Sequence, residues 1–245
     1  MTRWKVTCAY DGTDYSGWQS QADGSAVQNF IEGALSEVLR DSIKIHGASR
    51  TDSGVHANGQ CFHFDFPWNH NGEALCRAVN TKLPASIRIE AASLAPDDFH
   101  ARHSNIGKSY KYRFSTRPPN PFSIRYCWHI EREFRSERIT KVLKEFEGTH
   151  DFTAFAGKVH PQENPVKSIR SVKLISEGNS DWCLEVSGSG FLYRMVRSMA
   201  GSLIRVASGK LSADRIAELL EEKVRTTEVY TAPACGLFLE EVFYP

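Results

Sequence analysis

Hydrophobic and polar residues alternate early in the chain with the period of a strand and then recur with the period of a helix. Residues 3–10 alternate and end at the turn signal Asp11-Gly12, which predicts a strand. Ser25 and Gln28 then form the Ser-x-x-Gln pattern of a capping box, which predicts a helix start. The apolar positions that follow at helical spacing are Val27, Ile31, Leu35 and Val38.

The next predicted elements complete a compact α/β unit. They are a strand over residues 43–46, a polar loop over 47–59, an alternating strand over 61–66, a helix carrying Leu75, Val79 and Leu83, and a strand over 87–94. The resulting order β-α-β-β-α-β is the signature of the ferredoxin-like split unit.

A similar pattern restarts after Pro96. The predicted elements are strands over 110–114 and 126–130, a helix from Ser136 to Gly148, strands over 168–176 and 181–187, helices over 191–207 and 212–223, and a strand over 237–243. We therefore predict an α+β protein of two ferredoxin-like (RRM-like) domains with antiparallel sheets, residues 1–105 and 106–245.

Composition and cysteine content indicate the cellular compartment. The 245 residues are 41% hydrophobic and 24% charged, as in soluble globular proteins. No apolar run approaches the roughly 20 residues that span a bilayer, and the N-terminus lacks the features of a signal peptide. The six cysteines are scattered without a Cys-x-x-Cys pair, so we expect reduced thiols, a cytoplasmic protein and no membrane partner.

The net charge of +1 argues against a polybasic nucleic-acid coat and against an acidic tail, but it conceals a strong segregation of charge. Two windows, 101–129 and 188–210, contain only basic charged residues. These are Arg102, Lys108, Lys111, Arg113, Arg117 and Arg125 in the first window and Arg194, Arg197, Arg205 and Lys210 in the second. Such segregation suits a surface that follows phosphates.

Aromatic residues are interleaved with the first basic window. They are Tyr110, Tyr112, Phe114, Tyr126 and Trp128. Two interpretations stay open: the rings stack on unpaired RNA bases, or they form the core of a strand. In the helix over 191–207, Arg194, Arg197 and Arg205 share the polar side, which fits either a solvated face or a polyanion-binding face.

The loop over 47–59 holds the most informative chemistry. Arg50 and Asp52 are two positions apart and would project the same way in an extended loop, where the cation keeps the carboxylate ionised. Such a carboxylate can act as a nucleophile or a general base. The alternative is a surface ion pair beside a turn at Gly54.

This loop resembles the signature of the tRNA pseudouridine synthase A (TruA) family, close to Gly-Arg-Thr-Asp-Ala-Gly-Val-His-Ala. Similarity to that family extends over nearly the whole chain. The matching segments are 10–19, Val27-Gln28, 99–102, 108–112, 148–152, 190–197 and 231–237. Ser49 and Ser53 depart from the common pattern, while Arg50, Thr51, Asp52 and Gly54 retain it.

The resemblance implies an isomerase that converts uridine to pseudouridine at positions 38, 39 and 40 of the tRNA anticodon arm, without a cofactor. It implies a catalytic cleft between two sheets, a homodimer, Asp52 as nucleophile, Arg50 and Arg197 beside it, and Tyr110 packed on the target base. A base held inside a stem must be extruded before it can react. From the basic windows we expect further RNA contacts at Arg102, Lys108, Arg113, Arg194 and Arg205.

Other interpretations compete with this one. Cys61-x-His63 and His100-x-x-His103 suggest a metal, but no four-ligand spacing completes a site, so we predict none and regard His56 and His63 as structural. The segment around Asp11, Asp14, Trp18 and Gln19 contacts RNA or forms an Asx turn with a buried tryptophan. The rival functions are a non-catalytic RNA-binding protein and a carboxylate hydrolase, for which no second acid lies beside Asp52 in sequence.

Overall fold

The computed structural model describes residues 2–131, 133–178 and 180–245. The chain forms two compact units. Unit 1 comprises Met1–Ile106 together with Phe238–Pro245, and unit 2 comprises Gly107–Leu237. Both contain helices and strands, so the chain is a mixed α/β protein.

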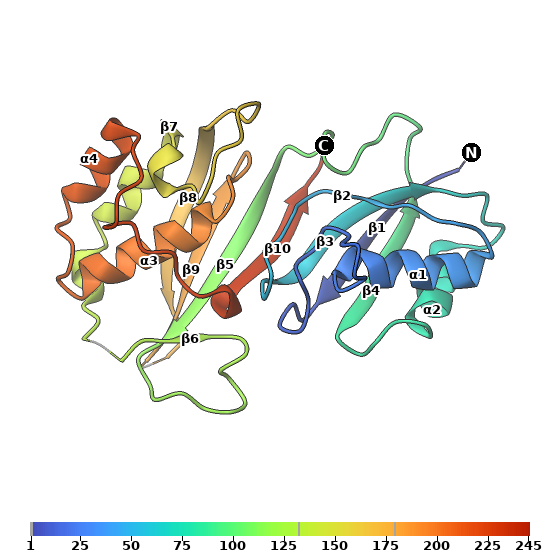
Figure 1. Ribbon diagram of the computed structural model, residues 1–245, viewed down its shortest axis with the longest axis horizontal. Helices are drawn as coiled ribbons and strands as arrows, with labels where there is room; N and C mark the ends of the chain where they lie inside the picture. The colour runs from blue at the N-terminus through green and yellow to red at the C-terminus, as the bar shows by residue number, and fades with distance from the viewer. Residues whose placement is uncertain (1, 132, 179) are drawn as a thin grey trace. The chain divides into compact units, whose positions relative to one another are not determined.

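Unit 1 is a sheet covered by two helices (Figure 1). Its strands are β1 (Arg3–Tyr10), β2 (His46–Gly47), β3 (His56–Asp65), β4 (Ile87–Leu94) and β10 (Leu237–Phe243). β1 lies between β4 and β3 and is antiparallel to both, and β2 is antiparallel to β3. The helices α1 (Val27–Leu39) and α2 (Gly72–Asn80) pack against one another, and α2 packs on β4.

The last strand returns to the first unit. Phe238 and Leu239 of β10 pair in parallel with His56 and Ala57 at the start of β3. The predicted domains, residues 1–105 and 106–245, assigned this segment to the second half, whereas backbone hydrogen bonds attach it to unit 1. Hydrophobic periodicity identifies a strand but not its partner, which is why the sequence prediction differed here.

Unit 2 is a second sheet with helices packed on it (Figure 1). Its strands β5 (Gly107–Ser115), β9 (Asp181–Gly188), β8 (Val166–Ser176) and β7 (Gly148–Asp151) follow one another in this order and are antiparallel. A short β6 (Trp128–His129) is parallel to β5. The remaining elements are α3 (Met195–Ala207), α4 (Arg215–Glu222) and the 3-10 turns η1 (Ser136–Arg138), η2 (Val142–Phe146), η3 (Thr153–Phe155) and η4 (Ala234–Gly236).

Several predicted elements are shorter than expected. The helix from Ser136 to Gly148 is two 3-10 turns, in a segment where the β-branched Ile139, Thr140 and Val142 weaken helix propensity. The helix over 191–207 begins only at Met195, because Arg194 is in the left-handed conformation with φ 61°. The strand over 126–130 shrinks to Trp128–His129.

The predicted capping box is wrong. α1 starts at Val27, its N-cap is Ala26, and no side chain caps it. The Ser25 hydroxyl instead donates to Asp23, and the Gln28 side chain accepts from Gln19.

In the described part of the chain, no helix is both long enough and apolar enough to cross a membrane.

Candidate functional site

The loop that carries Asp52 joins β2 to β3 in unit 1. Asp52 is half-buried, and its carbonyl accepts a hydrogen bond from Val55 N at 3.1 Å, which closes a tight turn. Gly54 in this turn has φ +77°, a conformation that favours glycine. Arg50 lies two residues before Asp52 in the same loop and is exposed.

Thr51 fixes the backbone immediately before Asp52. Its buried hydroxyl lies 2.8 Å from the Tyr10 hydroxyl, and its carbonyl accepts from Trp18 N at 3.1 Å. Gly17 approaches the same carbonyl so closely that an added Cβ would lie 2.6 Å from its oxygen. Contacts from the end of β1 and from the segment between β1 and α1 therefore hold the backbone of the Asp52 loop on one side.

Gln60 and Ser53 hold the loop at two further points. The buried Gln60 side chain bonds both the carbonyl of Ser49, at 2.7 Å, and its backbone N, at 3.2 Å. Ser53 donates to the Tyr15 carbonyl at 3.0 Å. Because these bonds fix the backbone on both sides of Asp52, its carboxylate is preorganised rather than carried on a mobile loop.

The segment between β1 and α1 has a structural role. Asp11 accepts from the backbone N of Thr13 at 3.0 Å and from its hydroxyl at 2.6 Å, which is an Asx turn. Trp18 is 1% exposed and stacks with Tyr10 at 5.9 Å between ring centroids. Of the two interpretations left open by the sequence, the structure favours the Asx turn with a buried tryptophan.

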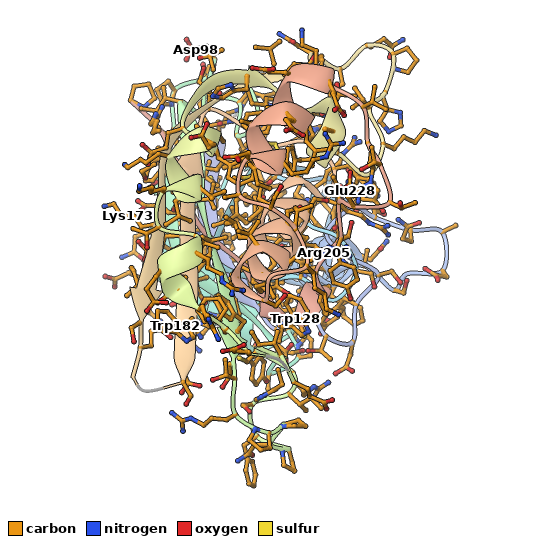
Figure 2. The ribbon with its side chains drawn as sticks, turned by 90° about the vertical axis from the view of Figure 1, so that its left-hand side faces the viewer. Asp98, Trp128, Lys173, Trp182, Arg205 and Glu228 are labelled. Atoms are coloured by element: carbon orange, nitrogen blue, oxygen red, sulfur yellow. The ribbon has the colours of Figure 1, made fainter. Side chains whose placement is uncertain are left out.

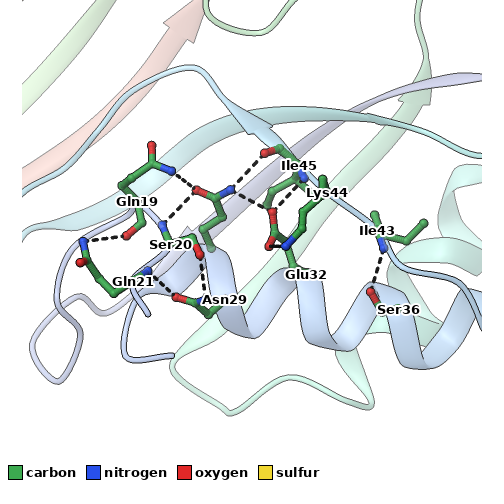
Figure 3. Close-up of polar contacts among 10 residues, drawn as sticks. Gln19, Ser20, Gln21, Asn29, Glu32, Ser36, Ile43, Lys44 and Ile45 are labelled. Carbon is green, nitrogen blue, oxygen red and sulfur yellow. Dashed lines mark hydrogen bonds and ion pairs between the residues drawn. The ribbon is translucent and has the colours of Figure 1, made fainter. Parts of the chain in front are cut away.

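The Gln28 side chain is buried and joins a polar network, of which Gln19, Ser20, Glu32 and Ile45 are labelled in Figure 3. Its Oε1 accepts from the Gln19 side chain at 2.9 Å and from Ser20 N at 3.1 Å. Its Nε2 donates to the Glu32 carboxylate at 2.9 Å and to the Ile45 carbonyl at 3.1 Å. One side chain thus ties the segment before α1 to the segment that leads into β2.

Glu32 completes this network. It is buried and accepts from Ile45 N at 3.1 Å and from the Lys44 ammonium at 3.0 Å (Figure 3). The chain that enters the Asp52 loop is therefore anchored to α1 through both backbone groups of Ile45.

His56 and His63 of unit 1 serve as hydrogen-bond acceptors in the structure. Nδ1 of His56 accepts from Gly12 N at 3.1 Å, and the ring stacks on Phe238 at 4.6 Å. Nδ1 of His63 accepts from Ala101 N at 3.2 Å. Burial, together with the neighbouring His100, lowers the pKa of His63 to about 4. The described residues contain no group of three or more ligands arranged to hold a metal ion.

Unit 2 carries most of the other predicted site residues. Tyr110 on β5 is 6% exposed, and its ring meets Phe191 edge-on at 5.1 Å. Tyr112 and Phe114 on the same strand are fully or nearly buried, so they belong to the core of the sheet rather than to a stacking surface. Trp128 is half-buried and packs against Tyr230 at 5.9 Å.

The three arginines of the 191–207 segment occupy different environments. Nε of Arg197, in the first turn of α3, donates to the Ala232 carbonyl at 2.8 Å, and Ala232 N donates back to the Arg197 carbonyl at 3.1 Å. Arg194 precedes the helix and lies over the Tyr193 ring at 4.8 Å. Arg205, labelled in Figure 2, lies in the last turn of α3, with a buried Nε.

The remaining predicted RNA contacts are divided between the units. Arg102 is exposed in unit 1, whereas Lys108 and Arg113 are half-buried on β5 of unit 2. Lys111 on the same strand pairs with Glu185 at 3.5 Å, which lowers the free positive charge of the basic window. The cations of this basic window therefore differ in exposure and in pairing, and they do not form a continuous row of exposed positive charge.

Gln28 and Gln60 position the site but were not predicted as site residues. Both are polar residues at positions that are buried in the structure, with exposed fractions of 8% and 0%. A buried polar side chain needs hydrogen-bond partners, so it often holds a neighbouring backbone in place. The sequence carried a signal for this role, because Gln60 is a polar residue in register with the apolar positions of the alternating strand over 61–66.

The sequence is similar to those of known proteins over nearly its whole length. A family model described as tRNA pseudouridine synthase matches residues 7–104 and 142–245. A tRNA pseudouridine synthase A of Latilactobacillus sakei is 40% identical over 245 residues, covering 99% of this chain and 98% of that protein. One from Streptococcus pneumoniae is 38% identical over 247 residues, covering 100% of this chain and 99% of that protein.

A much weaker structural likeness, with a TM-score of 0.39 and 10% identity, covers 82% of this chain and 45% of a chain in a solved Cbf5-Nop10-Gar1 complex. The sequence matches extend from the first strand to the last and include the Asp52 loop. The chain belongs to the tRNA pseudouridine synthase family.

Proposed function

We propose that this protein isomerises uridine to pseudouridine in tRNA and that Asp52 is its nucleophile. The observation that supports this role is the preorganised loop: Thr51, Ser49 and Ser53 are all held by hydrogen bonds around a half-buried carboxylate. Family membership supplies the reaction, and the loop geometry supports the choice of residue.

The reaction balances without a cofactor. The bond between N1 of uracil and C1′ of the ribose breaks, the base turns, and a bond forms between C5 and C1′. The proton on C5 is lost and N1 gains one, so substrate and product are isomers. A carboxylate nucleophile divides this exchange into two easier displacements.

The other proposed catalytic and binding residues act on the extruded base. Tyr110 offers an aromatic ring for the base, and this ring is itself held edge-on by Phe191. Arg197 has its Nε committed to Ala232, so its terminal nitrogens project from a fixed position. Arg50 is an exposed cation two residues from Asp52 and is proposed to pair with that carboxylate or to fill the space left by the extruded base.

The proposed substrate surface includes the remaining cations, Arg102, Lys108, Arg113, Arg194 and Arg205. Following the family resemblance, we propose the anticodon stem-loop as the target, with uridines at positions 38, 39 and 40, and a homodimer as the active form. All six cysteines are free thiols, which fits a reducing compartment and hence the cytoplasm.

We also propose that each unit is a ferredoxin-like (RRM-like) fold. In unit 1 the strands β4, β1, β3 and β2 are neighbours in that order, which is the arrangement expected for a β-α-β-β-α-β unit whose helices cover one face.

The test is release of the C5 proton from tRNA transcripts made with uridine labelled by tritium at C5. The Asp52→Asn variant keeps the size of the side chain and removes its charge, so we expect pseudouridine formation to fall by about 10³-fold or more while tRNA binding persists. Asp41→Asn, an exposed acid in the same unit, is the matched control and should retain full activity. Tritium release by Asp52→Asn at the wild-type rate would refute the nucleophile assignment, and binding without release by the wild type would favour a non-catalytic RNA-binding protein.

A further inference from the structure

A loop of unit 2, residues 116–127, exposes large apolar side chains to solvent. It follows β5 and leads to β6, and it extends away from the end of the sheet (Figure 1). Phe122 is 91% exposed, Ile124 is 52% exposed and Tyr126 is 37% exposed. Apolar side chains exposed together on one short segment mark interaction sites on protein surfaces, so this loop is a candidate binding surface.

The backbone of this loop is fixed by its own hydrogen bonds. The Asn120 side chain accepts from Phe122 N at 2.9 Å, and the Asn120 carbonyl accepts from Ser123 N and Ile124 N. His129 closes the base of the loop, because Nε2 lies 3.0 Å from the Ser123 hydroxyl and Nδ1 lies 3.1 Å from the Arg117 carbonyl. The backbone at Phe122 is therefore held in place, so binding at this residue costs little backbone conformational entropy.

The charge of the surrounding segment favours a polyanion as the partner. Residues 101–129 contain no Asp or Glu, and the loop itself carries Arg117 and Arg125. Arg117 pairs with Asp181 of β9 at 2.6 Å, which anchors the loop to the sheet. An exposed aromatic ring within an acid-free segment combines base stacking with attraction to phosphate.

The exposed ring of this loop contrasts with the aromatic rings of β5. Tyr112 and Phe114 are buried in the sheet, whereas Phe122 is exposed. We propose that the loop over 116–127 binds an unpaired nucleotide of the tRNA substrate, with Phe122 stacked on the base. This inference rests on the proposed function, because it takes tRNA as the substrate.

The experiment measures tRNA affinity and steady-state kinetics for three substitutions of Phe122. Phe122→Ala should weaken tRNA binding at least about fivefold, the lower end of what the loss of one base–aromatic stack produces, and raise KM with kcat unchanged at saturating tRNA. Phe122→Leu, which keeps apolar bulk without a π face, should lose as much as Phe122→Ala. Phe122→Trp should bind as tightly as the wild type.

Val224→Ala removes an exposed apolar side chain from another part of unit 2 and serves as the matched control, with unchanged affinity expected. The slope of log affinity against log salt should stay the same in all Phe122 variants, because a stacked ring releases no counterions.

The possible outcomes separate the two proposals. Wild-type affinity for Phe122→Ala in an enzyme that forms pseudouridine would overturn the stacking role alone. If Phe122→Leu matched the wild type while Phe122→Ala sedimented as a smaller species, the loop would be a contact between protein chains and the RNA proposal would be wrong. Failure of the wild type to bind or modify tRNA transcripts would overturn the proposed function, and the stacking role with it.

Discussion

Replacement of Gln28 by leucine tests whether the buried polar network stabilises unit 1. The substitution keeps the volume of the side chain but removes the amide that bonds Gln19, Ser20, Glu32 and Ile45. The Ile45 carbonyl then loses its side-chain partner in a buried environment, and Ser20 N loses one in a partly buried environment.

The magnitude follows from the groups left unsatisfied. A buried donor or acceptor without a partner costs about 1–3 kcal/mol. The Ile45 carbonyl falls in this range and the partly buried Ser20 N lies at its lower end, about 1 kcal/mol, so the two groups together predict a loss of about 2–4 kcal/mol in the free energy of unfolding. For a chain of this size, 1 kcal/mol corresponds to roughly 2–4 °C in Tm, which predicts a fall of about 5–15 °C.

The assay is thermal and urea unfolding followed by circular dichroism, with Lys44→Ala as the control. Lys44 is bonded to the same network through Glu32, but its side chain is 75% exposed, so its loss should cost less than about 1 kcal/mol. If Gln28→Leu unfolded within about 0.5 kcal/mol of the wild type, the network would not have the stabilising role assigned to it.

Two further predictions concern the Asp52 loop and the pH dependence of stability. Gly17→Ala places a Cβ 2.6 Å from the Thr51 carbonyl oxygen and should lower kcat for pseudouridine formation at least about tenfold. Gly24→Ala is the control: Gly24 has a similar φ of +76° and no atom within 4 Å of an added Cβ, so this variant should lose only about 1–2 kcal/mol of stability and keep its kcat. Equal kcat values in the two variants would contradict this reasoning. Burial and the neighbouring His100, His46 and Arg3, opposed by Asp65, lower the pKa of His63 to about 4, so the unfolded chain, with an ordinary histidine pKa of about 6.5, binds this proton more readily. The contribution of neutral His63 to stability is complete above about pH 6.5, is lost as the pH falls from 6.5 to 4, and amounts to at most about 3 kcal/mol. The free energy of unfolding measured with urea should therefore change less between pH 7 and pH 4.5 in His63→Gln than in the wild type. An equal change in both proteins would show that His63 is not responsible.

The sequence predicted the order of elements in unit 1 and the loop with Asp52, because both depend on local signals. Alternation over residues 3–10 and the polar run over 47–59 act within a few residues, and the structure places a strand and a loop there. The Asp52 loop could also be recognised because its motif is short and contiguous.

What the sequence could not supply depends on tertiary context. Ser25 and Gln28 have the spacing of a capping box, but Gln28 has better partners in Gln19, Glu32 and Ile45, so the box does not form. The left-handed conformation of Arg194 is likewise invisible to periodicity, although it decides where α3 begins. Alternation alone also could not distinguish buried Tyr112 from exposed Phe122 as a candidate for base stacking.

The pairing of β10 with β3 has a consequence for the order in which the protein matures. The parallel partner of His56 and Ala57 is Phe238–Leu239, which the ribosome synthesises only after all of unit 2. A nascent chain can form β1, β3 and β4, but the edge of β3 next to the Asp52 loop stays open until residues 238–245 emerge. Chains interrupted before this point would therefore carry the Asp52 loop beside an incomplete sheet, so completion of the sheet next to that loop depends on the synthesis of β10.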